Sequence, residues 1–145
     1  MQRALIALTL GAAIAGCSSV RNEPEFLITP EAATRPFSPA VRVGGLLFLA
    51  GKLGTDSTGK LVPGGIQAET RRAMENIGAE LRKAGSSFDR VVKCTVFLAD
   101  MGGWAAMNEV YAPFFPDGKR PARTAVAVSG LALDARVEIE CIAGA

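Results

Sequence analysis

The chain has 145 residues, of which 49% are hydrophobic, and a formal net charge of +2 at pH 7. This length fits one domain, and the hydrophobic fraction is ample for a core. The small and evenly spread charge, with a single Trp and a single Tyr, argues against a nucleic-acid-binding protein. The chain contains no histidine, which excludes Ser-His and Cys-His nucleophilic systems and histidine-ligated metals.

The first seventeen residues have the pattern of a secretion signal. Arg3 supplies a positive charge, and residues 4–14 form an uncharged, mostly apolar stretch that is too short to span a bilayer. With Ala15-Gly16-Cys17 after it, the segment resembles a bacterial lipoprotein signal, which implies a lipidated Cys17 as the mature N-terminus. An ordinary cleaved signal with an incidental cysteine is the alternative. By the same resemblance, Ser18 implies a lipid-anchored protein in the bacterial cell envelope, on the periplasmic face of the outer membrane.

The next segment, residues 18–36, is polar and contains three prolines, Pro24, Pro30 and Pro36. Prolines at this density interrupt regular structure, so we expect a flexible tether that holds the domain away from the membrane. The folded domain is then expected to run from residue 37 to residue 145.

Seven segments of this domain have the pattern of a strand or a helix. Residues 41–51 read as two strands, or one bent strand, around Gly44-Gly45, and apolar residues recur at helical spacing from Ile66 to Ala84. The later segments are a strand over 91–98, a helix over about 104–115, and strands over 123–128 and 136–142. The order is strand, strand, helix, strand, helix, strand, strand. Two helices can cover one face of such a sheet, whereas several strands are apolar on both faces, so we expect a second copy of the chain on the other face.

Two cysteines fall in strand-like segments of the domain, at Cys94 and Cys141. Neither forms a CxxC or a zinc-binding spacing, and no metal site is expected. The apolar surroundings favour two buried free thiols, and a disulfide is the alternative if the domain lies in an oxidising compartment.

The candidate chemistry is carried by Arg123 and Glu138, each in a strand. Alternate side chains of a strand share a face, so Arg123 points with the small Ala125, which leaves room for a ligand beside the guanidinium. Glu138 points with Glu140. From composition alone, a structural ion pair between neighbouring strands is the favoured interpretation of Arg123 and Glu138.

Four segments, in their order and spacing, resemble the Rid family of reactive-intermediate deaminases, also called the YjgF family. They are Lys93–Asp100, Asn108–Phe115, Arg120–Thr124 and Val137–Glu140. The resemblance covers about residues 37–143. It implies an α/β (α+β) chorismate-mutase-like fold, with a mixed sheet and two helices on one face. It also implies a homotrimer with clefts between its subunits.

The resemblance also implies an activity. Active members of the family hydrolyse imines and enamines, such as 2-aminoacrylate, to 2-keto acids and ammonia, without a metal or an organic cofactor. Arg123 matches the arginine that holds the substrate carboxylate, and Glu138 matches the glutamate that positions the attacking water. Gly51 and Asn108 match positions that line the cleft.

Three positions depart from the family pattern: Glu69, at a helix position that is often Gln, and two positions of the cleft. Many members carry Gly-Pro-Tyr near the first strand, and we align this motif with Ser38-Pro39-Ala40, so that Ala40 replaces a tyrosine of the cleft. Many also have a cysteine two residues after the arginine, where this chain has Ala125. Both changes would open the cleft. The sequence therefore predicts an imine/enamine deaminase, and the alternative is a non-catalytic trimeric lipoprotein that binds a small ligand or a partner protein in the same cleft.

Overall fold

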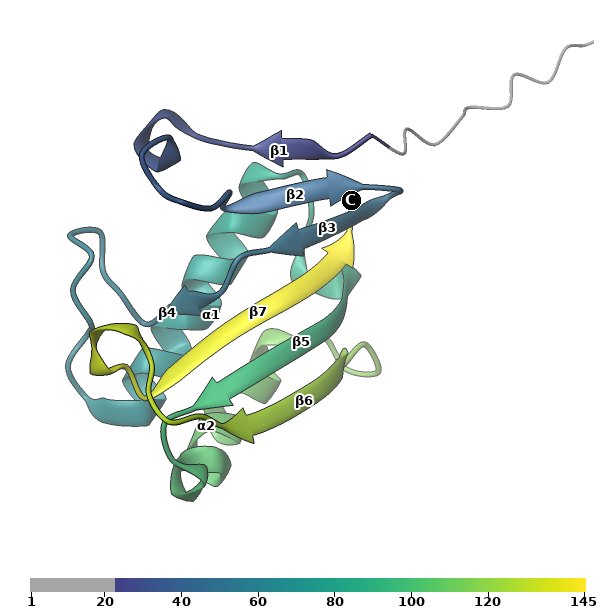
Figure 1. Cartoon of the computed structure of the whole chain (residues 1–145). Coiled ribbons are helices and arrows are strands. Elements are labelled where there is room, and N and C mark those ends of the chain that lie inside the picture. Colours follow the sequence, from purple (N-terminus) through teal and green to yellow (C-terminus); the bar gives the residue numbers. More distant parts are fainter. Residues whose placement is uncertain (1–22) are drawn as a thin grey trace, which may run out of the picture.

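A computed structural model describes residues 23–145, which form one mixed sheet with two helices behind it (Figure 1). The strands are β1 (Glu25–Leu27), β2 (Ala40–Val43), β3 (Leu46–Leu49), β4 (Lys52–Leu53), β5 (Val91–Leu98), β6 (Ala122–Ala127) and β7 (Val137–Gly144). The helices are α1 (Gly65–Lys83) and α2 (Trp104–Tyr111). Short 3-10 helices cover Pro30–Ala32, Phe88–Arg90, Met101–Gly103, Ala112–Phe114 and Ala132–Asp134.

The strand order is β1-β2-β3-β7-β5-β6, and β4 also pairs with β7. Only β5 and β6 run parallel, whereas the other pairs are antiparallel. Both helices lie on one face of the sheet (Figure 1). The predicted mixed sheet with two helices on one face is therefore confirmed.

The helix boundaries follow local chemistry. Helix α1 ends at Lys83, and Gly85 after it has a φ of +75°, the left-handed conformation in which glycine stops a helix at little cost. The predicted second helix reaches Phe115, but α2 ends at Tyr111 and continues as a 3-10 turn over Ala112–Phe114. Pro113 has no backbone N–H to donate, which explains the change.

The core lies between the helices and the sheet. Val96 on β5 and Ile139 on β7 are opposite one another, fully buried, and face the helices. Met74 and Ile77 of α1 belong to the same buried cluster. Because strand side chains alternate, the residues between the buried ones point to the other face of the sheet, which neither α1 nor α2 covers.

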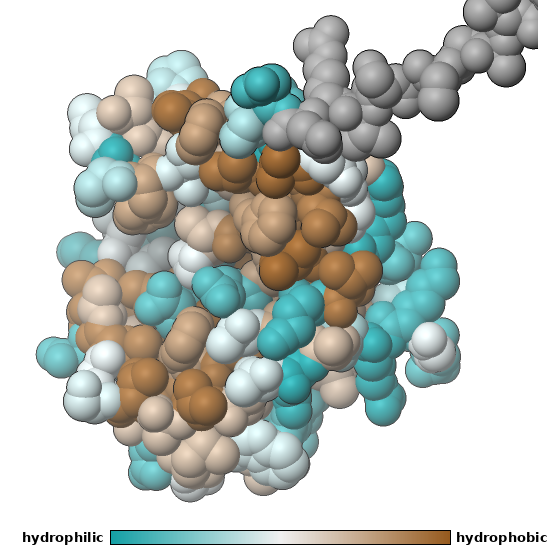
Figure 2. Space-filling view, turned by 45° about the vertical axis from the view of Figure 1, so that its right-hand side comes forward, coloured by the Kyte–Doolittle hydropathy of each residue, from teal (hydrophilic) through white to brown (hydrophobic). Residues whose placement is uncertain are grey.

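This open face carries an apolar row across four strands. Phe26 pairs with Val41, Val41 with Phe48, and Phe48 with Ile142, so their side chains align from β1 to β7. Phe26 is 61% exposed and Phe48 is 40% exposed. In Figure 2 hydrophobic side chains gather in two areas of this surface, with a hydrophilic band between them. Exposed apolar rows of this kind mark surfaces that another molecule covers.

The predicted flexible tether covers residues 18–36, and over residues 23–36, which the structure describes, the chain differs from that prediction. Glu25–Leu27 forms the edge strand β1, and Pro30–Ala32 forms a 3-10 turn. Leu27 packs against the core, and Glu25 makes a salt bridge of 2.7 Å with Arg42, so these contacts order the segment despite its prolines. The predicted signal peptide and Cys17 lie outside the described residues. Within residues 23–145 no helix is both long and apolar enough to cross a bilayer.

Cys94 and Cys141 form a disulfide across 47 residues of sequence, instead of the two free thiols favoured above. The antiparallel register of β5 and β7 sets the two residues opposite each other, both buried on the helix side. Sequence spacing could not reveal this, because strand pairing brings the two segments together only in the folded chain.

We expect the disulfide to stabilise the fold mainly by restricting the unfolded chain. Reduction should lower the free energy of unfolding by about 2–4 kcal/mol, because the bridge closes a long loop. Urea unfolding with and without dithiothreitol measures this change. The matched control is the double variant Cys94→Ala/Cys141→Ala, whose stability should not respond to the reductant. Equal stability of the oxidised and reduced wild type would contradict the expectation.

Candidate active site

Arg123 lies on the edge strand β6 and points to the helix side of the sheet. Its guanidinium carbon lies 4.8 Å from the centroid of the Tyr111 ring, a cation–π contact. Within residues 23–145 the guanidinium makes no salt bridge and no hydrogen bond to a side chain or carbonyl. Its N–H donors are therefore available to an anion.

Tyr111, the last residue of α2, packs its ring against one face of the Arg123 guanidinium. The side chain is 5% exposed, and its ring packs against Phe115 at a centroid distance of 4.9 Å. Burial raises the pKa of Tyr111 to about 12, against the opposing effect of the Arg123 charge. The phenol is therefore neutral at physiological pH. Its hydroxyl is buried and has no hydrogen-bond partner among residues 23–145.

Glu138 lies on β7 and points to the open face. Its carboxylate packs against the backbone of Gly51: a Cβ atom at position 51 would lie 2.0 Å from Glu138 Oε1. No side chain other than hydrogen fits there, so Gly51 is required for this position of the carboxylate. Burial, followed by the nearby Glu140 charge, raises the pKa of Glu138 above its ordinary value. In the part of the chain that the structure describes, no cation pairs with this carboxylate.

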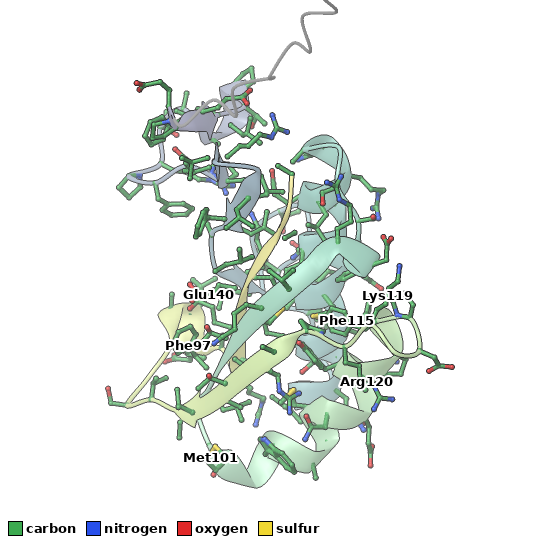
Figure 3. All side chains as sticks on the ribbon, turned by 90° about the vertical axis from the view of Figure 1, so that its right-hand side faces the viewer. Phe97, Met101, Phe115, Lys119, Arg120 and Glu140 are labelled. Atoms are coloured by element: carbon green, nitrogen blue, oxygen red, sulfur yellow. A yellow bond between two sulfur atoms is a disulfide. The ribbon has the colours of Figure 1, made fainter. Side chains whose placement is uncertain are left out.

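Arg123 and Glu138 do not meet within one chain. Strand β5 lies between β6 and β7, so the two residues are two strand spacings apart, about 10 Å, before the shift along the strands is added. They also lie on opposite faces of the sheet. Figure 3 shows the same division, with Glu140 on the open side and Phe115 on the helix side. The structural ion pair between neighbouring strands, favoured by composition alone, is therefore wrong.

Gly51 borders a groove of about 500 Å³ between α1, the segment before β2, and residues 51–57, which include β4. Phe37 and Leu53 line this groove with Gly51. Asn76 on α1 fixes its wall by donating hydrogen bonds of 3.0 Å to the carbonyls of Leu53 and Thr55. Glu138 does not line this groove, because its side chain points to the other face of the sheet.

Ala40 does not line the groove, contrary to the prediction, because it is 1% exposed in the core on β2. Phe37 is the aromatic residue that does. The segment Arg35-Pro36-Phe37 contains the Pro-aromatic pair of the family's Gly-Pro-Tyr, so the sequence carried this signal three residues before the stretch we aligned. The ring is retained at this position, and only the phenolic hydroxyl is lost.

Asn108 lies on α2, whose last residue contacts Arg123, and Ala125 lies on β6 two residues after Arg123. Asn108 precedes Tyr111 by one turn of α2, and it lines a surface hollow between α2 and the segment after it. Ala125 follows Arg123 on the same face of β6 and packs against the core. The predicted residues thus form two separate groups, one around Arg123 and the other made of Gly51 and Glu138.

No group of three or more potential metal ligands occurs among the residues that the structure describes. The chemistry of the two groups is instead that of an anion-binding guanidinium and a carboxylate with a raised pKa. Together they could hold a negatively charged molecule and exchange a proton with it.

Known proteins share this fold and sequence. Residues 28–145 match the sequence profile of the family described as endoribonuclease L-PSP. A RutC family protein of Pyrococcus horikoshii is 50% identical over 109 residues, which cover 74% of this chain and 86% of that protein. The 2-iminobutanoate/2-iminopropanoate deaminase of Mus musculus is 46% identical over 113 residues, which cover 77% of this chain and 83% of the mouse protein.

A solved structure agrees. YyfA from Yersinia pestis, a Rid family protein of unknown function, is 36% identical and has a TM-score of 0.79. The alignment covers 85% of this chain and all of that one, which confirms the chorismate-mutase-like fold. The described domain of this chain therefore belongs to the Rid, or endoribonuclease L-PSP, family.

Proposed function

We propose that this protein is a deaminase that hydrolyses small imines and enamines bearing a carboxylate, such as 2-aminoacrylate, to 2-keto acids and ammonia. The observation that carries the proposal is a guanidinium on an aromatic ring with no anionic partner within residues 23–145. The name of the mouse relative supports the reaction, because that protein is a 2-iminobutanoate/2-iminopropanoate deaminase.

The active site, in this proposal, forms between two copies of the chain in a homotrimer. One copy supplies Arg123, and the next supplies Glu138 with Gly51. Two findings support this arrangement: the residues lie on opposite faces of one sheet, and the open face carries an uncovered apolar row. Burying that row against another copy would stabilise the trimer and bring the two groups together.

Arg123 binds the substrate carboxylate through two parallel hydrogen bonds from its planar guanidinium. These hydrogen bonds fix the neighbouring imine carbon in one place, so that the attack of a bound water on this carbon becomes an effectively unimolecular step. The ring of Tyr111 occupies one face of the guanidinium and leaves the in-plane donors free for this purpose.

Glu138 positions the water and accepts its proton. The water oxygen attacks the imine carbon, a C–O bond forms, and the electron pair of the C=N bond moves to nitrogen. Glu138 returns this proton to the nitrogen, which gives a carbinolamine. Glu138 then transfers the hydroxyl proton of the carbinolamine to the nitrogen, the C–N bond breaks as the C=O bond forms, and ammonia leaves with the 2-keto acid as the second product. The reaction changes no oxidation state, so it needs no redox cofactor, and a protonated imine carbon is electrophilic enough for water to attack without a metal. The raised pKa makes the Glu138 carboxylate a stronger proton acceptor than an ordinary glutamate.

A non-catalytic ligand-binding protein is the alternative. It would need Arg123 but no carboxylate with a raised pKa, so Glu138 favours catalysis. Cleavage of RNA, which the description of the matching family names, gains no support from a chain with a charge of +2 and no histidine.

We also propose that the protein is anchored in the bacterial envelope through a lipidated Cys17. The lipoprotein-like sequence of residues 1–17 supports this location. The disulfide between Cys94 and Cys141 supports it too, because disulfides persist mainly in oxidising compartments such as the periplasm.

The reaction can be tested with imines generated in the assay by an amino-acid oxidase. The protein should accelerate their hydrolysis over buffer, and Arg123→Ala should lower kcat/KM about 100-fold through loss of a charged bidentate contact. Arg71→Ala, which removes an exposed arginine from the outer face of α1, is the matched control and should retain the wild-type rate. If the protein accelerates hydrolysis of none of the imines formed from several amino acids, the proposal is wrong.

Complementation tests the shared site. Arg123→Ala and Glu138→Gln alone should each have at most about one hundredth of the wild-type activity, whereas trimers co-expressed from equal amounts of both should recover about a quarter of the wild-type rate. Random assembly gives that fraction of interfaces with both native residues. Each variant expressed alone is the control. If the mixed trimers are as inactive as the single variants, the site does not lie between copies.

The pH dependence should follow Glu138. Its base form is lost as pH falls through its pKa, and since that pKa is raised, the acidic limb of kcat should lie above the ordinary glutamate value of about 4.3. Glu140→Gln removes the like charge beside it and should move the limb to lower pH. Glu75→Gln, on the far surface of α1, should leave the limb in place. If the acidic limb of kcat stays at the same pH in Glu140→Gln, the assignment of the limb to Glu138 is wrong.

A further inference from the structure

We infer that the aromatic ring of Tyr111 is a positioning residue for Arg123, and that it sets the affinity of the protein for the substrate carboxylate. The inference deepens the proposed function and rests on it. Tyr111 would act through Arg123 and would not itself touch the reacting atoms.

The geometry gives Arg123 one side-chain partner within residues 23–145. The guanidinium carbon lies 4.8 Å from the Tyr111 centroid, inside the distance at which a ring face attracts a cation. Since β6 is an edge strand, only β5 flanks it, and the backbone alone cannot fix a side chain with several rotatable bonds. The Tyr111 ring therefore determines which orientation of the Arg123 guanidinium is populated.

A ring holds this arginine differently from a carboxylate. An acidic partner would occupy the in-plane N–H donors and neutralise the charge, so it would compete with the substrate. A stacked ring contacts the face of the guanidinium and leaves its in-plane donors and its full charge for the ligand. The arrangement is therefore suited to a site that must bind an anion and release it.

The ring is itself held rigidly. Tyr111 packs on Phe115 at 4.9 Å, and Phe115 packs edge-on against Phe88 at 5.5 Å. Phe88 also packs at 5.4 Å from Phe114. This aromatic cluster joins the end of α2 to the segment before β5. The Tyr111 ring that contacts Arg123 is therefore part of the hydrophobic core.

The hydroxyl of Tyr111 has no part in this role. It is buried and has no partner within the described part of the chain, so replacing it with hydrogen removes an unsatisfied polar group. Tyr111→Phe separates the ring from the hydroxyl, because it keeps the first and deletes the second.

The test measures KM and kcat for imine hydrolysis, together with the dissociation constant of 2-oxobutanoate, the 2-keto acid formed from 2-iminobutanoate. Tyr111→Phe should retain the wild-type values, whereas Tyr111→Leu should raise KM and the dissociation constant about 5- to 30-fold with little change in kcat. The matched control is Ile77→Val, which removes a methylene group from the core on α1, outside the aromatic cluster. It should lower stability and leave KM unchanged.

A series of fluorinated phenylalanines at position 111 keeps the shape of the ring if Tyr111→Leu fails to fold. Each added fluorine weakens the attraction between the ring face and a cation, so KM should rise stepwise along the series. A flat series, an unchanged KM in Tyr111→Leu, or an equal loss in Tyr111→Phe would each overturn the inference. In an active wild type these results leave the proposed function standing, whereas a wild type that neither hydrolyses imines nor binds 2-oxobutanoate would refute both.

Discussion

The antiparallel pairing of β7 with β5 is the constraint on which the rest of the molecule depends. It aligns Val96 with Ile139 and Cys94 with Cys141 on the helix side, and so it builds the centre of the core. The alternation of side chains along the same two strands then sends Glu138 to the opposite face. On its other side β5 holds β6 in parallel, with Cys94 beside Arg123. One pairing thus supports both the fold and the separation of the two functional residues.

That separation leaves two opposite charges without partners within residues 23–145. The Glu138 carboxylate packs against Gly51, and its partly buried surroundings raise its pKa. The Arg123 guanidinium packs on the ring of Tyr111, which does not neutralise its charge. Partly buried charges without partners cost stability, so their retention points to a role in function. In the proposed trimer, a substrate between two copies would meet both. The apolar row on the open face would supply the association energy that the charges do not.

Sequence patterns predicted the parts of the fold that depend on local periodicity. The strand over 91–98 was predicted with its observed bounds, and the helix over 66–84 differs from α1 by one residue at each end. Patterns failed where contacts distant in sequence decide the structure. Residues 25–27 form a strand because β2 offers an edge to pair with, and the motif near Phe37 was aligned three residues too late. The adjacency of the two cysteines depends on strand register, which spacing does not encode.

By itself, the sequence determined the class of chemistry. A chain without histidine or a zinc-binding cysteine spacing, but with Arg123 and Glu138 in family-like segments, leaves an anion-binding guanidinium and a proton-accepting carboxylate. Only the tertiary structure decided how these groups are arranged, because the face and neighbours of a strand residue depend on which strands pair. The sheet order put β5 between them, Gly51 made space for one, and the ring of Tyr111 supported the other.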